Sequence, residues 1–278
     1  MSRSFVLAPV WVWLVLLLAV PVGIVLAISL AGTADAVPPF ALGFSFESFR
    51  SILTDALYRD ALFLSLGVAG LSTALCLLLG YPMALAIARA PERWRDPLLL
   101  ALMLPFWTGF LMRINAWIGL LADDGWIVAA LSWLAGGPVR LLYTDSALYL
   151  GMVYTYLPFM VLPLYAALSR LDPVLQDAAA DLGAPPWDRF VRVTLPLSLP
   201  GIAAGCALVF IPAVGEYIVP ELLGSPGAQL AGRVLWSEFF ANRDWPMASA
   251  LAVVLLVLLL AVPAAVRLAV SHRFQQRG

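Results

Sequence analysis

Long apolar runs separated by short polar segments make up most of the chain. Six of these runs are long enough to cross a bilayer as a helix, which takes about 20 residues. They cover residues 7–31, 60–88, 97–121, 147–168, 197–223 and 246–270. The first is too long for a removable signal peptide and has no convincing cleavage site. The pattern therefore predicts an all-α polytopic membrane protein, with residues 1–278 forming a single membrane domain of six transmembrane helices.

Two weaker segments lie between these runs. Residues 46–58 form an amphipathic piece of the loop after the first run. Residues 126–142 are moderately apolar, but Gly136, Gly137 and Pro138 interrupt them. Because glycine and proline break short helices, we expect the second segment to be interfacial or re-entrant rather than a seventh crossing.

Composition narrows the class of protein. The chain is 63% hydrophobic, with a mean hydropathy of +0.94, and its net charge of -1 argues against a nucleic-acid partner. All 16 basic side chains are arginine, so the lysine of a nucleotide-binding P-loop is missing and the chain is not itself an ATPase. A single histidine, His272, leaves no His-rich metal site, and the isolated Cys76 and Cys206 are interpreted as core residues. We therefore expect no metal or cofactor on this chain.

Arginines in the loops predict the orientation, because basic residues accumulate on the cytoplasmic side. With the N-terminus inside, ten arginines lie on the cytoplasmic side and five outside, and Arg113 falls within a segment. The inner set is Arg3, Arg89, Arg93, Arg95, Arg170, Arg189, Arg192, Arg267, Arg273 and Arg277; the outer set is Arg50, Arg59, Arg140, Arg233 and Arg243. Both termini and the polar loop at 177–196 are thus expected in the cytoplasm.

That loop is the longest charged interruption in the second half of the chain. Asp172 followed by Pro173 predicts the start of a short helix, and Gly183 predicts its end, because glycine tolerates positive φ. A second amphipathic turn is expected at 187–192. The result would be a compact pair of short helices with an exposed apolar ridge, which favours a docking surface for another protein. The alternative is an ordinary loop between membrane helices.

The loop also carries a recognisable spacing. Asp177, Ala178 and Ala179 are followed after three residues by Gly183, and after nine more by Val-Thr-Leu-Pro at 193–196. This arrangement resembles the E-A-A signature of the permease subunits of bacterial ABC importers, with Asp in place of Glu and Val in place of Ile. The resemblance implies that a cytoplasmic coupling loop, residues 170–196, inserts into an ATPase subunit and transmits its closure. The residues implied in coupling are Asp177, Ala178, Ala179, Gly183, Trp187, Arg189, Leu195 and Pro196.

Two carboxylates fall within the fifth apolar run. Residues 210–221 are expected to break the helix twice and to place the carboxylates of Glu216 and Glu221 near the break. Acidic side chains in a membrane are costly unless they face a cavity or a partner. Glu216 is therefore predicted to line a substrate pathway, the alternative being a structural ion pair with Arg113. For Glu221, nearer the outer surface, we expect a solvated side chain.

Aromatic side chains near these acids indicate the kind of substrate. Trp107 and Tyr156, together with Glu216, would suit an organic amine, because aromatic faces attract ammonium groups. Each of these aromatics could instead anchor a helix at the interface or pack against another helix. The full predicted pathway set is Trp107, Arg113, Tyr156, Glu216, Tyr217 and Glu221. Gly201 and Gly205 also have the spacing of a close helix-packing face.

Four stretches extend the resemblance over most of the chain after residue 89. Residues 104–117, 152–168, 208–224 and 233–250 are similar to the permeases of bacterial polyamine importers, those for putrescine first and those for spermidine next. The resemblance implies a type I importer fold in the inner membrane, a second homologous permease, an ATPase dimer that holds ATP and Mg, and a periplasmic binding protein. Spermidine, an opine or another small solute is the alternative cargo. A secondary transporter would need charges on several membrane helices, which the sequence lacks.

Overall fold

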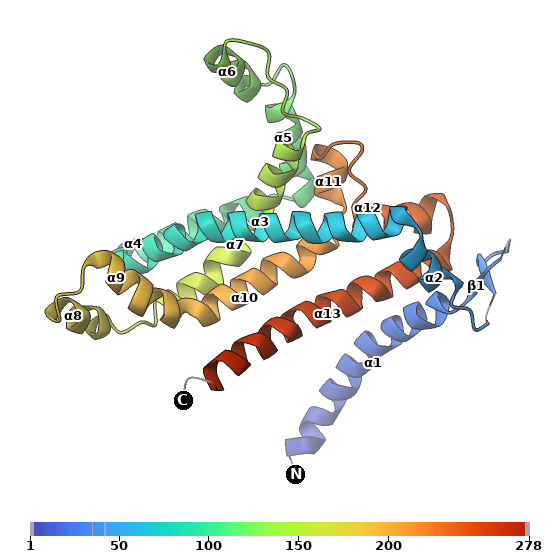
Figure 1. Ribbon diagram of the computed structural model, residues 1–278, viewed down its shortest axis with the longest axis horizontal. Coiled ribbons are helices and arrows are strands. Elements are labelled where there is room, and N and C mark those ends of the chain that lie inside the picture. The colour runs from blue at the N-terminus through green and yellow to red at the C-terminus, as the bar shows by residue number, and fades with distance from the viewer. Residues whose placement is uncertain (1–2, 35, 42, 276–278) are drawn as a thin grey trace. The chain divides into compact units, whose positions relative to one another are not determined.

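The computed structural model describes residues 3–34, 36–41 and 43–275 of the chain, which are mostly helical (Figure 1). The chain divides into two compact units. Unit 1 joins Met1–Leu64 with Gln229–Gly278, and unit 2 is Ser65–Ala228. The long helix α3 (Ala56–Arg89) contributes its first residues to unit 1 and the rest to unit 2.

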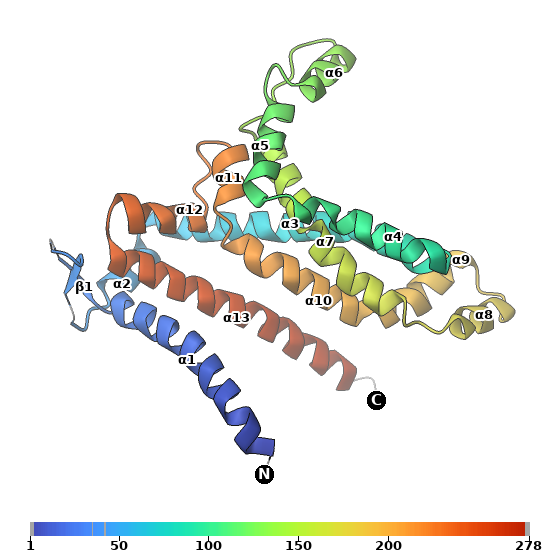
Figure 2. The same cartoon turned by 180° about the vertical axis from the view of Figure 1, so that it is seen from behind.

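Unit 1 is built around two long helices that lie side by side, α1 and α13 (Figures 1 and 2). Its elements are α1 (Arg3–Ser29), the antiparallel pair β1 (Gly32–Thr33) and β2 (Phe40–Ala41), α2 (Glu47–Thr54), α12 (Ala231–Trp236), the π-helical turn η3 (Ser237–Ala241) and α13 (Trp245–Gln275). The amphipathic segment at 46–58 is thus partly α2, which packs on α13 as its apolar face requires.

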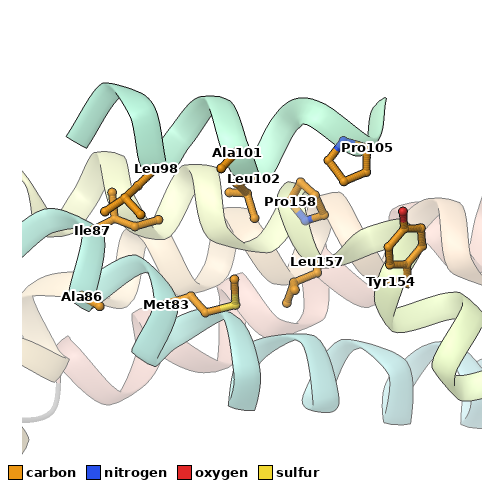
Figure 3. Close-up of a pocket in the computed structure, with 10 residues that line it drawn as sticks. All are labelled: Met83, Ala86, Ile87, Leu98, Ala101, Leu102, Pro105, Tyr154, Leu157 and Pro158. Atoms are coloured by element: carbon orange, nitrogen blue, oxygen red, sulfur yellow. The ribbon is translucent and has the colours of Figure 1, made fainter. Parts of the chain in front are cut away.

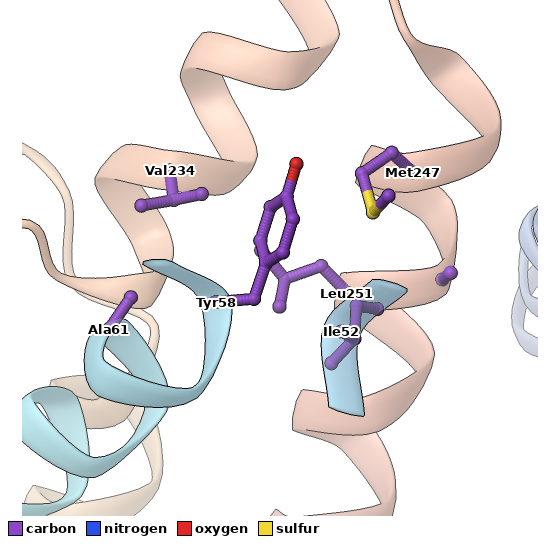
Figure 4. Close-up of a cluster of buried hydrophobic side chains, with 7 residues drawn as sticks. Ile52, Tyr58, Ala61, Val234, Met247 and Leu251 are labelled. Carbon is purple, nitrogen blue, oxygen red and sulfur yellow. The ribbon is translucent and has the colours of Figure 1, made fainter. Parts of the chain in front are cut away.

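A cluster of buried side chains ties α2, α3, α12 and α13 together (Figure 4). The ring of Tyr58 lies between Val234 and Met247, and its hydroxyl donates a hydrogen bond of 3.0 Å to the buried carboxylate of Glu238. Asn242 donates to the second oxygen of that carboxylate at 2.9 Å. Both oxygens of this buried acid therefore have a donor, as burial demands.

Unit 2 holds the remaining helices. They are α4 (Glu92–Met103), the 3-10 turn η1 (Leu104–Trp107), α5 (Phe110–Leu121), α6 (Trp126–Ala135), α7 (Asp145–Leu168), α8 (Pro173–Asp181), α9 (Pro186–Arg189), the π-helical turn η2 (Phe190–Thr194), α10 (Leu195–Val214) and α11 (Ile218–Leu223). Helices α7 and α10 run side by side along most of their length (Figures 1 and 2).

Two glycines allow the close approach of α7 and α10. A Cβ atom at Gly201 would lie 2.5 Å from the Cβ of Ala167, and one at Gly205 would lie 2.7 Å from the sulfur of Met160. Real Cβ atoms do not approach other atoms so closely, so only glycine fits. The predicted packing face of small residues is confirmed.

Five helical segments in the described part of the chain are long and apolar enough to cross a membrane: Trp11–Ser29, Ala56–Arg89, Phe110–Ala135 (α5 together with α6), Asp145–Leu168 and Pro186–Val214. A shorter apolar helix, Trp245–Ala261, lies within α13. The helices predicted at 7–31, 60–88, 147–168 and 246–270 are confirmed as α1, α3, α7 and α13.

The prediction of one continuous helix at 97–121 was wrong. The chain leaves the helix after η1, where Thr108 is extended (φ −84°, ψ 142°). Pro105 has no N–H to donate, and its carbonyl accepts instead from the Thr108 hydroxyl at 2.7 Å and from Nη1 of Arg113 at 2.8 Å. These two side-chain bonds stabilise the break.

The fifth run breaks only once. α10 ends at Val214 and α11 begins at Ile218, as expected around Glu216. The prediction of a second break within residues 210–221 was wrong, because α11 continues through Pro220. Pro220 lies in the first turn of α11, where a backbone N–H has no partner within the helix, so proline is tolerated there.

Candidate functional site

The first candidate site is the coupling segment, residues 170–196, whose helix α8 has defined ends. The Asp172 side chain accepts from the backbone N–H of Val174 at 3.0 Å, and Pro173 occupies the first helical position. At the other end Gly183 has φ +78°, and the N–H groups of Gly183 and Ala184 bond back to Ala180 and Ala179. This is a Schellman arrangement, so both predicted ends of the helix are confirmed.

Large apolar side chains of the coupling segment form an exposed ridge on its surface. Leu182 is 88% exposed and Trp187 70% exposed, and Val174 and Leu175 are also exposed. Of the predicted coupling residues, Asp177, Ala178, Gly183, Trp187 and Pro196 are exposed, while Ala179, Arg189 and Leu195 are partly buried. Large apolar side chains in water indicate a surface made for a partner.

Gln176 joins the coupling segment to the membrane helices. Its amide nitrogen donates to the hydroxyl of Thr194 at 3.2 Å, and its amide oxygen accepts from Arg89 at 3.5 Å. Thr194 is buried at the start of α10, and Arg89 is the last residue of α3. A single side chain therefore contacts two elements that enter the membrane.

The second candidate site surrounds Glu216, at the break between α10 and α11. One carboxylate oxygen accepts a hydrogen bond from the hydroxyl of Tyr156 on α7. The other accepts from the backbone N–H groups of Ile218 and Val219, at 3.0 and 3.4 Å. Glu216 thus caps the first turn of α11, where the N–H groups have no partners within the helix.

The side chain of Arg113 contacts η1 and the start of α5 instead of Glu216. Its guanidinium donates to the carbonyl of Pro105 and stacks over the rings of Phe106 and Phe110, with its central carbon 4.7 and 5.7 Å from their centroids. Glu216 and Arg113, both within the described part of the chain, are not joined by an ion pair, so the pair considered from sequence is not formed.

Aromatic rings connect the two charged groups. The Tyr156 ring lies 6.2 Å from that of Phe159, which meets the ring of Phe106 edge to face at 5.4 Å. The guanidinium of Arg113 lies over the ring of Phe106. A continuous series of aromatic contacts therefore connects Glu216 with Arg113.

The remaining predicted pathway residues are placed differently. Trp107 is 82% exposed, so it does not close over Glu216 within this chain. Tyr217 and Glu221 are partly buried at the start and in the first turn of α11. One carboxylate oxygen of Glu221 is shielded from solvent, so the expectation of a solvated side chain was wrong.

Two cavities adjoin Tyr154 of α7. An apolar one of about 470 Å³ lies between α3, α4 and α7, and Met83, Leu102 and Leu157 contribute to its wall (Figure 3). A second, of about 420 Å³, includes Arg113 and Trp117. Their linings differ in chemistry, the first being apolar and the second containing a cation.

Sequence reasoning missed Phe159 and Gln176. Phe159 follows Tyr156 by three residues on one helix, and that spacing places both on the same face. Gln176 gave no comparable signal, because its two partners are distant in sequence. Among the residues that the structure describes, no group of three His, Cys, Asp or Glu side chains could hold a metal ion.

Comparison with known proteins identifies the family. Residues 4–274 match the family described as the binding-protein-dependent transport system inner membrane component. The chain belongs to this family. It is therefore a multi-pass permease of the inner membrane and a transport component of an ABC importer rather than an enzyme. Permeases of this kind work with a second permease, an ATPase and a periplasmic binding protein.

Curated relatives extend over most of the permease. This chain is 39% identical over 259 residues to the spermidine/putrescine transport system permease protein PotB of Haemophilus influenzae. The match covers 92% of this chain and 90% of the relative. The chain is also 39% identical over 249 residues to PotB of Escherichia coli K12, covering 89% and 90%. Both relatives are named for two polyamines, whereas the resemblance of the four stretches placed putrescine before spermidine.

A solved structure supports the fold. The permease superposes on a chain of the bacterial alginate ABC transporter in complex with an alginate pentasaccharide-bound periplasmic protein, with a TM-score of 0.70. The match covers 94% of this chain and 92% of the other at 20% identity. The predicted type I importer fold, with about six membrane helices, is confirmed.

Proposed function

We propose that this permease imports a polyamine from the periplasm to the cytoplasm, using ATP that a partner subunit hydrolyses. The observation that carries the proposal is the carboxylate of Glu216, held at a helix break within a membrane protein whose relatives are named for spermidine and putrescine. An intramembrane acid is costly to keep and is a functional hypothesis by default.

The geometry around Glu216 suits an ammonium group. Its three donors fix the carboxylate in one orientation, and each carboxylate oxygen can accept more than one hydrogen bond. The rings of Tyr156 and Phe159 add faces that attract a cation. A methylene chain of the solute could lie against the apolar residues nearby, so a diamine matches both parts of the site.

Alternating access is the mechanism we infer. A loaded binding protein would dock outside on loops near residues 47–58, 140–145 and 225–244, and the coupling segment would meet the ATPase inside. Closure of the ATPase would shift the coupling segment and with it the helices around Glu216. This scheme treats residues 1–278 as one membrane domain with both termini in the cytoplasm.

Uptake of labelled putrescine by the reconstituted importer tests the function. The vesicles would contain this permease, the second permease and the ATPase, with the binding protein added outside. Unlabelled putrescine, spermidine, an opine and sulfate would serve as competitors. We expect vanadate to inhibit uptake and a polyamine to compete best.

The outcomes separate the candidate functions. Competition by putrescine itself supports the putrescine assignment, and stronger competition by spermidine moves it to the longer amine. No uptake of labelled putrescine by the assembled importer, or stronger competition by the opine or sulfate than by either polyamine, would overturn the polyamine proposal. Uptake that vanadate leaves unchanged would instead indicate a secondary transporter.

A further inference from the structure

A chain of contacts leads from the exposed ridge of the coupling segment into the membrane helices of unit 2. The ring of Trp187 lies 5.6 Å from that of Phe190, and Phe190 meets the ring of Tyr81 edge to face at 5.6 Å and 87°. The Tyr81 hydroxyl is 2.9 Å from the hydroxyl of Ser198. Four side chains thus connect α9, η2, α3 and α10.

Burial increases along this chain of contacts. Trp187 is 70% exposed, Phe190 is partly buried, Tyr81 is 9% exposed and Ser198 is fully buried. One end can therefore contact a partner protein, while the other is enclosed among membrane helices. Packed side chains of this kind move together, because protein interiors have little free volume.

The direction of the inner hydrogen bond follows from proton counting. Ser198 donates its only hydroxyl proton to the backbone carbonyl of Leu195, at 2.9 Å. Tyr81 must therefore be the donor to Ser198. The phenol hydroxyl is thus required for the bond, and phenylalanine at position 81 would keep the ring contact but lose the link to α10.

The backbone between the two ends is also unusual. Residues Phe190–Thr194 form a π-helical turn, a wide turn that is often found at functional sites. The same turn ends at Thr194, which receives the hydrogen bond from Gln176 of α8. Both short helices of the coupling segment therefore contact η2 or its end.

We propose that Tyr81 is a positioning residue that makes α3 and α10 follow the movement of the coupling segment. A displacement of Phe190 would shift the Tyr81 ring through their edge-to-face contact. The Tyr81 hydroxyl would then shift Ser198 through the hydrogen bond between them. This inference rests on the proposed coupling role of the segment and adds to it two buried residues, Tyr81 and Ser198.

The test uses the whole importer, reconstituted with both permeases, the ATPase and the binding protein. The variants are Tyr81→Phe, Ser198→Ala and the double variant, and the measurement is putrescine or spermidine taken up per ATP hydrolysed. We expect this ratio to fall about twofold to tenfold in each single variant, the range that one net hydrogen bond gives. The double variant should fall no further, because both changes remove the same bond.

A matched control is Tyr165→Phe on α7. The Tyr165 hydroxyl makes no hydrogen bond with the residues that the structure describes, so this variant loses the same atom without the link. A merely structural role would lower assembly or total activity and leave the ratio unchanged. Wild-type uptake with an unchanged ratio in Tyr81→Phe and Ser198→Ala would overturn the inference.

A second readout separates this inference from the proposed function. If the wild-type importer takes up neither amine, the polyamine proposal fails, but stimulation of the ATPase by the loaded binding protein still reports on coupling. Weaker stimulation in Tyr81→Phe and Ser198→Ala, but not in Tyr165→Phe, would then support the link. Equal stimulation in all of them would reject it.

Discussion

At the scale of single residues, Glu216 combines two tasks. It caps α11 through two backbone N–H groups and receives the Tyr156 hydroxyl, and in our proposal it also meets the solute. A change of charge and a change of shape at this position should therefore have separable effects, because glutamine keeps the acceptor oxygen and removes the charge.

Glu216→Gln should lower uptake of a cationic amine at least tenfold while the importer still assembles. A hydrogen bond to a charged group contributes about 1.5–3 kcal/mol, and that range corresponds to about tenfold to a hundredfold. The measurement is initial uptake rate against amine concentration in reconstituted vesicles. Glu92→Gln, at an exposed position in the first turn of α4, is the control. Unchanged uptake would leave Glu216 with its capping role alone.

Tyr156→Phe tests how firmly the carboxylate is held. The variant keeps the ring that contacts Phe159 and removes the hydroxyl donor to Glu216. We expect a smaller loss than in Glu216→Gln, because the two backbone donors remain. A Tyr156→Phe importer that loses as much uptake as Glu216→Gln would show that the phenol itself contacts the solute.

At the scale of elements, Gly183 ends α8 with a backbone conformation that L residues rarely adopt. No atom lies within 4 Å of a Cβ placed there, so Gly183→Val adds strain without a steric clash. We expect an importer that inserts into the membrane normally but shows weaker binding of the ATPase, measured by co-purification. Gly227→Val is the matched control. A Cβ added at Gly227 also has no atom within 4 Å, and the φ angle there is not in the left-handed region. Equal co-purification of both variants would count against the docking role.

Gly205 sets the distance between α7 and α10, so its replacement should act on packing instead. Gly205→Leu would place a side chain against Met160 and should destabilise the permease by about 1–3 kcal/mol. Thermal unfolding of the purified protein in detergent measures this loss. Gly67→Leu on α3, where a Cβ meets open space, should leave the unfolding temperature nearly unchanged.

The sequence predicted most elements because their causes are local. Apolar length defines α1, α3, α7 and α13, and the Asp172 cap and Gly183 define α8. The break after η1 was missed because it depends on Arg113, a residue eight positions from the Pro105 carbonyl that it contacts. The pairing of Tyr156 with Glu216 could not be predicted either, since it requires knowing which faces of α7 and α10 meet.

At the scale of the whole molecule, the orientation remains a prediction from the arginine distribution, and labelling can test it. In a variant with Cys76 and Cys206 replaced by alanine, a cysteine at Leu182 should react with a membrane-impermeant maleimide only from the cytoplasmic side. Arg140→Cys, in the polar loop after α6, should react only from outside. Both positions are highly exposed, so burial would not mask the result. The reverse pattern would invert the proposed topology.

The placement of Glu216 has a consequence for how such importers could change cargo during evolution. Of the two oxygens proposed to meet the solute, one secures the first turn of α11 and the other accepts the hydroxyl of Tyr156. A mutation that adapts position 216 to a new solute would therefore also loosen that helix. New specificities should therefore arise first through replacement of the surrounding aromatic residues. Glu216 itself should be replaced only in lineages where another side chain already caps the first turn of α11.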